Sequence, residues 1–141
     1  DPKKNMTFNP SESIDFNGNT GPFIQYTHAR IRSILRKNEE ELEAKKELLN
    51  YKPDEKEISL IKLVYEFPEI IEASARELSP ALIANYTYEL VKVFNSFYQN
   101  VSILGADNQN EKVFRVQLAQ SVANTIKNAF GLLGINVPHR M

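Results

Sequence analysis

The sequence contains no cysteine, which excludes disulfide bonds and thiolate metal sites. Its two histidines, His28 and His139, lie far apart and have no carboxylate pattern near them, so we expect no metal site. No run of apolar residues approaches the length of about 18 that a membrane span requires, and the polar first residues lack the apolar stretch of a signal peptide. We therefore expect a cytoplasmic protein that makes no contact with a membrane.

The signatures of common catalytic sites are also missing. Residues 18–22, GNTGP, superficially resemble a glycine-rich phosphate loop, but they lack the GxGxxG or GxxxxGK[ST] spacing and follow no predicted strand. The chain has no paired His and Glu at metal spacing and no nucleophile with a suitable base. We therefore predict no catalytic residue and no cofactor site in this chain, and we interpret the glycines as turn residues.

The length and composition fit one domain. The chain has 141 residues, and 42% of them are hydrophobic, which is enough for a single core. It starts at Asp1 rather than at an initiator methionine, so we expect it to be part of a longer protein. The first 22 residues are rich in Asn, Ser, Gly and Pro, which indicates irregular structure. We predict a leader over residues 1–17 and a helical domain over residues 18–141.

The net charge is −1, but the charges are unevenly distributed. Residues 16–38 contain four cations and no acid, and residues 112–141 contain four more cations and again no acid. Between them, residues 39–78 hold twelve acids against six bases. If the fold brings the two basic segments together, one face carries about +8 and attracts nucleic acid. Charge alone leaves this possibility open beside ordinary solvated helix faces.

Hydrophobic spacing indicates helices and no sustained strand. Gly21 and Pro22 begin the first helix, because proline at the first helical position loses no hydrogen bond. We expect Pro68 to separate the second helix from the third, and Pro138 to prevent helix near the C-terminus. The predicted helices cover residues 21–50, 55–67, 68–78, 80–102 and 111–132. The predicted fold is all-α, a bundle of about five helices.

Three segments carry a family resemblance: GNTGPFIQYTHARIRSI at residues 18–34, YTYELVKVFNSFY at 86–98 and LLGINVPHRM at 132–141. The first resembles the Gly-x-Thr-Gly-Pro-aromatic-x-Gln-Tyr-x-x-x-Arg string that opens the C-terminal anticodon-binding domain of arginyl-tRNA synthetases. The second is similar to the Tyr-x-x-x-Leu-x-x-x-Phe-Asn-x-Phe-Tyr helix of that domain, and the third to its Leu-Leu-Gly-Ile, Pro and final Arg-Met. Val116 stands where the family usually has Leu, and the Asp-Ala-Leu-Arg string of the wider DALR family is absent.

The resemblance implies a piece of a class I synthetase that joins arginine to its tRNA with ATP and Mg²⁺. The HIGH-like and KMSKS-like signatures of the catalytic core are absent from this chain. The resemblance therefore implies that residues 1–17 end a catalytic domain that lies upstream, and that residues 18–141 bind the anticodon stem and loop. By this interpretation the partners are arginine tRNA and the upstream domain, and the chain alone is inactive.

In the family that the chain resembles, contacts near the anticodon come from the start of the first helix and from the C-terminal methionine. By motif position this implies Phe23, Tyr26, Arg30 and Met141. Residue spacing agrees, because Phe23, Tyr26 and Arg30 are three and four residues apart on one helix face. Unstacked bases pack on aromatic rings, and a cation can meet a phosphate. Periodicity alone, however, favours core positions for both aromatics.

Arg32 and Tyr98 complete the predicted tRNA-binding residues. Arg32 and Arg36 share another face of the first helix, where phosphate binding competes with plain solvation. Tyr98 and Asn95 divide between packing and a contact to the RNA loop, with Tyr98 the better candidate. The alternative function is a helical interaction module that docks on the synthetase core or on another subunit, with its basic face merely solvated.

Overall fold

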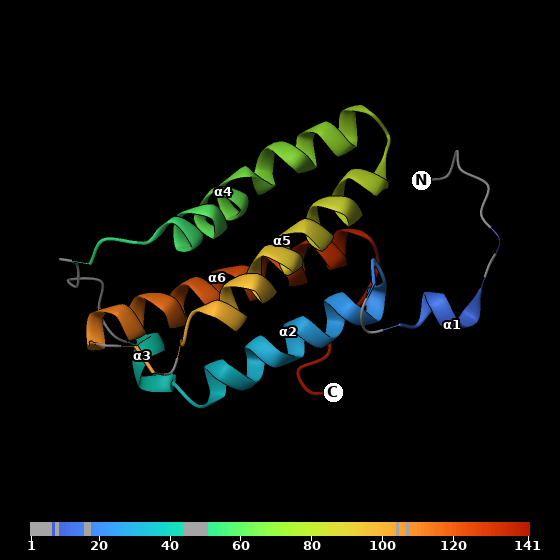
Figure 1. The fold of residues 1–141 in the computed structure, drawn as a ribbon. Helices are drawn as coiled ribbons and strands as arrows, with labels where there is room; N and C mark the ends of the chain where they lie inside the picture. The colour runs from blue at the N-terminus through green and yellow to red at the C-terminus, as the bar shows by residue number, and fades with distance from the viewer. Residues whose placement is uncertain (1–6, 8, 16–17, 44–50, 104, 107) are drawn as a thin grey trace.

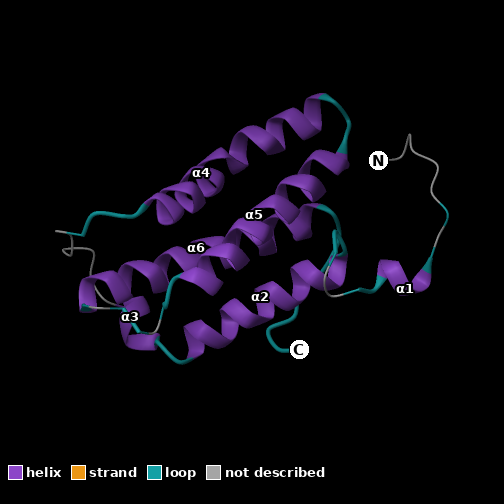
Figure 2. Cartoon of the chain, in the orientation of Figure 1, coloured by secondary structure: helices purple, strands orange, loops and turns teal. Residues whose placement is uncertain are grey.

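The computed structural model describes residues 7, 9–15, 18–43, 51–103, 105–106 and 108–141, and this part of the chain contains helices and no strand (Figure 1, Figure 2). The helices are α1 Pro10–Ser13, α2 Gly21–Arg36, α3 Glu39–Glu43, α4 Glu55–Arg76, α5 Pro80–Asn100 and α6 Gln109–Leu132. None of these helices is long and apolar enough to cross a membrane. The all-α bundle is confirmed, with six described helices where about five were predicted.

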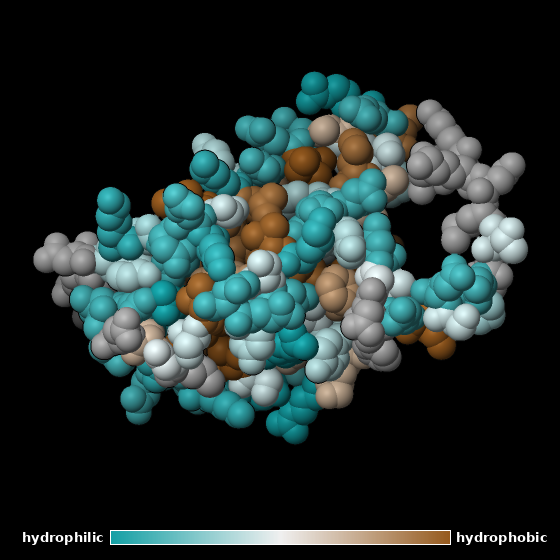
Figure 3. Space-filling view, viewed as in Figure 1, coloured by the Kyte–Doolittle hydropathy of each residue, from teal (hydrophilic) through white to brown (hydrophobic). Residues whose placement is uncertain are grey.

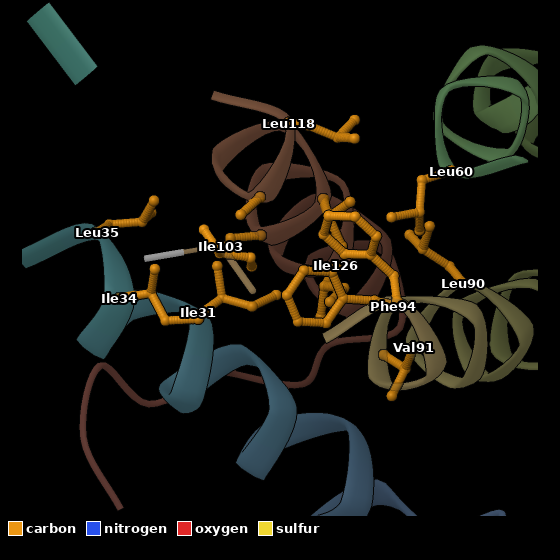
Figure 4. Close-up of a cluster of buried hydrophobic side chains, with 14 of the residues drawn as sticks. Ile31, Ile34, Leu35, Leu60, Leu90, Val91, Phe94, Ile103, Leu118 and Ile126 are labelled. Atoms are coloured by element: carbon orange, nitrogen blue, oxygen red, sulfur yellow. The ribbon is translucent and has the colours of Figure 1, made fainter. Parts of the chain in front are cut away.

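The four long helices α2, α4, α5 and α6 enclose one hydrophobic core. Helix α6 packs against each of the other three, and its buried side chains accordingly lie on much of its circumference. Figure 4 shows the centre of this core, where Ile31 of α2, Leu60 of α4 and Phe94 of α5 meet side chains of α6. All three are fully buried, so close packing in this core sets how α2, α4 and α5 lie against α6.

The leader predicted to be irregular contains one helical turn, α1. Asn9 caps this turn, since its Oδ1 accepts a hydrogen bond from the backbone N–H of Ser11 at 3.2 Å. Figure 1 shows α1 beside the bundle rather than within it.

The first predicted helix is shorter than expected, because α2 ends at Arg36 and the chain turns before α3. Asn38 explains the turn: its buried side-chain Nδ2 donates to the Ile34 carbonyl oxygen at 2.7 Å, the acceptor that its own backbone N–H would need for the helix to continue. Helix α3 then packs against α6, where Glu41 Oε1 lies 2.6 Å from Lys112 Nζ. The rest of the predicted helix, residues 44–50, lies outside the described residues.

The predicted break at Pro68 is wrong, because α4 runs through this proline without interruption. Proline removes one backbone donor from a helix, but packing against α5 stabilises α4 around this position. The Tyr86 hydroxyl of α5 donates to the Leu63 carbonyl oxygen at 2.7 Å, and the Tyr86 ring stacks on Phe67 with 5.4 Å between centroids. Contacts with α5 therefore hold α4 together on the turn before the proline.

The C-terminal tail, which we define as residues 135–141, turns back from the end of α6. Gly134 adopts a left-handed conformation with φ +73°, which glycine tolerates without strain. The N–H of Ile135 donates to the Phe130 carbonyl oxygen at 2.9 Å, and the N–H of Gly134 donates to the Gly131 carbonyl oxygen at 3.1 Å, which is a Schellman motif. The tail therefore leaves α6 in a set direction and passes beside α2 (Figure 1).

Candidate nucleic-acid interface

The start of α2 sets the positions of two aromatic side chains. Thr20 caps the helix, because its Oγ1 accepts a hydrogen bond from the N–H of Phe23 at 3.3 Å. From this start Tyr26 points outward, and 41% of its surface is exposed. Phe23 is half-buried against the core, and its ring centroid lies 5.9 Å from that of Tyr88. Tyr26 thus presents its ring to solvent, whereas Phe23 mainly supports the surface from below.

Arg30 lies between two tyrosines from different helices. Its guanidinium carbon is 4.8 Å from the ring centroid of Tyr26 on α2 and 5.4 Å from that of Tyr98 on α5. Both distances are short enough for cation–π attraction. Tyr98 is 38% exposed, so this cluster of one cation and two rings lies at the surface.

A chain of hydrogen bonds orients the guanidinium group. Arg30 Nη1 donates to Asn95 Oδ1 at 3.0 Å, and Asn95 Nδ2 donates to Thr27 Oγ1 at 3.0 Å. The buried Thr27 hydroxyl donates in turn to the Phe23 carbonyl oxygen at 3.1 Å. Because each group has a partner, the side chain of Arg30 is held in one position before any ligand arrives.

Hollows lie on both sides of the Tyr26 and Arg30 pair. The α2–α5 hollow has a volume of about 540 Å³ and is lined on its α5 side by Lys92, Asn95, Ser96 and Gln99. The C-terminal hollow has a volume of about 370 Å³ and is lined by Tyr26, Ala29, Arg30, Ser33, Arg36, Arg140 and Met141. Two cations and two amides line the α2–α5 hollow, and three cations line the C-terminal hollow, and all of these groups can donate hydrogen bonds.

The structure brings Met141 to the predicted site. Its side chain is 61% exposed and lines the C-terminal hollow together with Tyr26 and Arg30, although these residues lie at opposite ends of the chain. Phe23, Tyr26, Arg30, Tyr98 and Met141 therefore gather in one region, five of the six residues predicted to bind tRNA.

Arg32 does not join this region. It lies two positions beyond Arg30 on α2, and side chains two positions apart on a helix point in different directions. Arg32 accordingly lines neither hollow. Its Nε is buried and has no hydrogen-bond partner among the described residues. Arg36, one turn beyond Arg32 on the same face of α2, reaches the C-terminal hollow, where its Nη1 donates to the His139 carbonyl oxygen at 3.0 Å.

The face of charge +8 that the charge distribution left open does not form, because two of its eight cations are paired with acids. Lys112 pairs with the nearly buried Glu41, and Arg115 Nε lies 2.8 Å from Oε1 of the fully buried Glu57. Arg115 also pairs with Glu111 and donates from Nη1 to a loop carbonyl at 3.1 Å. Arg115 therefore links α4, α6 and the loop after α5, and it contributes to the fold rather than to a basic surface.

The sequence interpretation missed Lys92, Ser96 and Gln99 as lining residues of the α2–α5 hollow. A signal for them exists: they lie on α5 at spacings of four and three, on the side opposite Leu90 and Phe94, which are buried. Arg140 was likewise not singled out, since nothing local shows that the tail returns to α2.

Known proteins resemble the chain over nearly its whole length. A family model described as the DALR anticodon binding domain matches residues 24–141. The chain is 60% identical over 141 residues to the arginine–tRNA ligase of Flavobacterium psychrophilum, with all of this chain and 23% of the relative covered. It is 52% identical over 143 residues to the arginine–tRNA ligase of Parabacteroides distasonis, with 24% of that relative covered. The chain thus spans about a quarter of the length of these curated relatives.

Solved structures agree in fold. The arginyl-tRNA synthetase of Thermus thermophilus superposes with a TM-score of 0.88 at 32% identity, over 99% of this chain and 24% of that one. The arginyl-tRNA synthetase of Plasmodium falciparum superposes with a TM-score of 0.78 at 26% identity, over 95% of this chain and 23% of that one.

Proposed function

The chain belongs to the DALR anticodon-binding domain family, and from this we propose that it binds the anticodon stem and loop of arginine tRNA. The observation that carries the proposal is the cluster of Tyr26, Arg30 and Tyr98 at the surface between α2 and α5. Both similarity and local chemistry support it, since the curated relatives are named arginine–tRNA ligases.

Stacking supplies the first part of the proposed binding. An anticodon loop presents unstacked bases, and a base stacked on an aromatic ring contributes about 1 to 3 kcal/mol. Tyr26 and Tyr98 are both partly exposed, and both hollows border Tyr26, so a base can reach the part of its ring that Arg30 leaves uncovered. Phe23 supports this platform from below and reaches the RNA only at the wall of the α2–α5 hollow.

Cations supply the second part. Arg30, Arg36 and Arg140 line the C-terminal hollow, and Lys92 lines the α2–α5 hollow. When phosphates of the RNA pair with these cations, counterions are released, so the affinity for RNA falls as the salt concentration rises. We assign Arg32 at most a supporting role in this binding, because it lines neither hollow.

The chain would serve this role within a longer arginine–tRNA ligase that acts in the cytoplasm. There the domain would help the enzyme to select arginine tRNA, while the catalytic domain uses ATP and Mg²⁺. Among the described residues, no group of three or more His, Asp or Glu side chains is placed to hold a metal ion.

The decisive experiment is a titration of the chain with arginine tRNA and with a mismatched tRNA at two salt concentrations. We expect tighter binding of arginine tRNA, and a log–log dependence on salt with a slope of several units, because each neutralised phosphate contributes about 0.7 to 0.9. Binding that is absent, or that does not change with salt, would overturn the proposal.

A second candidate function, docking on the synthetase core or on another subunit, rests on the outer face of α4. Ile58, Ile61 and Tyr65 lie at spacings of three and four on this helix, and Tyr65 is 80% exposed. Figure 3 shows a separate hydrophobic surface, between α4 and α5, among mostly hydrophilic side chains. If docking is the function, Ile61→Glu abolishes association with the catalytic domain, and the chain has no affinity for tRNA.

A further inference from the structure

Three side chains of α2 bind three carbonyl groups of the C-terminal tail. Gln25 Nε2 donates to the Asn136 carbonyl oxygen at 2.8 Å, and Arg36 Nη1 donates to that of His139 at 3.0 Å. Between them, His28 Nδ1 lies 3.0 Å from the carbonyl oxygen of Pro138. A carbonyl oxygen can only accept, so Nδ1 of His28 carries the proton in this contact. The tail lacks secondary structure, and α2 supplies the donors that a strand or helix would otherwise provide.

These donors occupy a single stripe of α2. Gln25, His28 and Arg36 recur at spacings of three and eight, with Arg32 between the last two, so all four side chains project on one side of the helix. Val137 adds an apolar contact, because it is partly buried against the core. The tail is thus held by hydrogen bonds along its length and by one hydrophobic anchor.

Burial keeps the central donor neutral. It lowers the pKa of His28 below its ordinary value, and the nearby charges of Arg32, His139 and Lys127 act in the same direction, against the hydrogen bond to Pro138. A neutral imidazole has one N–H, and here that N–H is used for the tail.

The stripe ends where the proposed RNA site begins. Beyond His139, the last two residues, Arg140 and Met141, line the C-terminal hollow beside Tyr26 and Arg30. If the tail were free, binding RNA through these two residues would require ordering them, which opposes association. A tail that is already held avoids that cost.

We propose that Gln25, His28 and Arg36 are positioning residues that hold the C-terminal tail as one wall of the RNA site, with Arg140 and Met141 presented to the RNA. This inference rests on the proposed RNA-binding function. It also gives a physical role to Gln25, whose side chain turns away from the aromatic cluster and toward the tail.

Gln25→Ala tests the proposal directly, because Gln25 lines neither hollow and the change removes the hydrogen bond to the Asn136 carbonyl oxygen. We expect carboxypeptidase to remove the last residues of the variant faster than those of the unmodified chain in the absence of RNA. We also expect the variant to bind arginine tRNA about tenfold more weakly. Gln120→Ala is the matched control, because this glutamine lies on α6 and lines neither hollow, and it should change neither rate nor affinity.

A chain that lacks residues 140–141 distinguishes positioning from general destabilisation. If Gln25 acts through these two residues, Gln25→Ala should not weaken RNA binding any further in the shortened chain. An equal loss in both backgrounds would overturn the inference, as would wild-type affinity of Gln25→Ala in the full chain. Absence of tRNA binding by the unmodified chain would instead overturn the proposed function, and with it the role of the tail in RNA binding.

Discussion

The guanidinium group of Arg30 lies against the ring of Tyr26, with 4.8 Å between the guanidinium carbon and the ring centroid. The two residues are one helical turn apart on α2, and Asn95 of α5 fixes the guanidinium from the other side. The cation and the aromatic face are therefore arranged before a ligand binds, which reduces the entropy lost on binding.

Replacing Tyr26 by leucine should weaken the binding of arginine tRNA by about 1 to 3 kcal/mol, because the variant keeps an apolar side chain but loses the stacking surface. Fluorescence or filter-binding titration measures the change. Tyr65→Leu on α4 is the matched control, since this tyrosine is 80% exposed and lines neither hollow. Equal affinities of the two variants would show that Tyr26 does not stack on a base.

Replacing Arg30 by alanine should lower tRNA affinity and also reduce the log–log salt slope by about 1, since one phosphate contact is lost. Titrations at three or more salt concentrations give the slope. Arg76→Ala, at the end of α4, provides the control for removal of a cation outside both hollows. A weaker but equally salt-dependent Arg30→Ala would assign Arg30 to ring orientation rather than to phosphate.

Arg115→Met should destabilise the domain by about 3 to 5 kcal/mol, because it leaves the carboxylate of Glu57 buried without its cation. Urea denaturation measures the free energy of unfolding. In the exposed pair of Lys92 and Glu89, Lys92→Met should change that free energy by less than about 1 kcal/mol. A small effect of Arg115→Met would mean that Tyr51, whose hydroxyl also donates to Glu57, suffices for that carboxylate.

Acidification should destabilise the domain through His28 as the pH falls through the ordinary histidine pKa of 6.5 toward the lower pKa of the folded chain. Its pKa in the folded chain is lowered below the ordinary value of 6.5 by burial, so the unfolded chain binds the proton more readily. The stability that is present above pH 6.5 is therefore lost as the pH falls toward the folded pKa. Thermal unfolding at several pH values gives the slope.

His28→Gln is the control for this pH dependence, because glutamine can still donate to the Pro138 carbonyl but does not titrate. Its unfolding free energy should vary less over the same range. Glu41 does not interfere in this window, since its hydrogen bond to Lys112 lowers its pKa below 4.5, and its contribution is lost only at more acidic pH. Equal slopes for the two chains would contradict the assignment to His28.

Gly134→Ala should destabilise the domain by about 1 kcal/mol or more, because alanine is strained at φ +73°. Gly131→Ala should have the opposite sign and stabilise by about 0.5 to 1 kcal/mol, since Gly131 lies within α6 and an added Cβ meets no atom within 4 Å. Denaturant unfolding of both variants tests the pair. The same sign for both would contradict the left-handed turn at the start of the tail.

The sequence predicted helix boundaries correctly where they are set by residues at the boundary itself. Thr20 and Pro22 begin α2 through a side-chain cap and a preset φ, and neither needs a tertiary contact. Pro68 shows the limit of such rules, because the preference of proline to end a helix is about as large as a few packing contacts, and α5 supplies those contacts.

The candidate site was predictable where it lies on one helix. Tyr26 and Arg30 share a face because they are four residues apart, and the family resemblance singled them out. Tyr98 and Asn95 join Arg30 from 68 and 65 positions away, and spacing carries no information about such pairs. The same holds for Lys112 and Arg115, whose acidic partners lie 71 and 58 positions away and remove two cations from the predicted basic face.

By itself, the sequence determined the helical class, the start of α2 and the family to which the chain belongs, because these depend on periodicity, capping and local motifs. Only the tertiary structure decided that Phe23 faces inward and Tyr26 outward, since the same helical spacing suits a core stripe and a surface stripe. It also decided that Met141 lies beside Tyr26, because the turn at Gly134 and the donors of α2 direct the tail there. Which face of a helix meets a neighbour is set by packing with the other helices, and that information is not local.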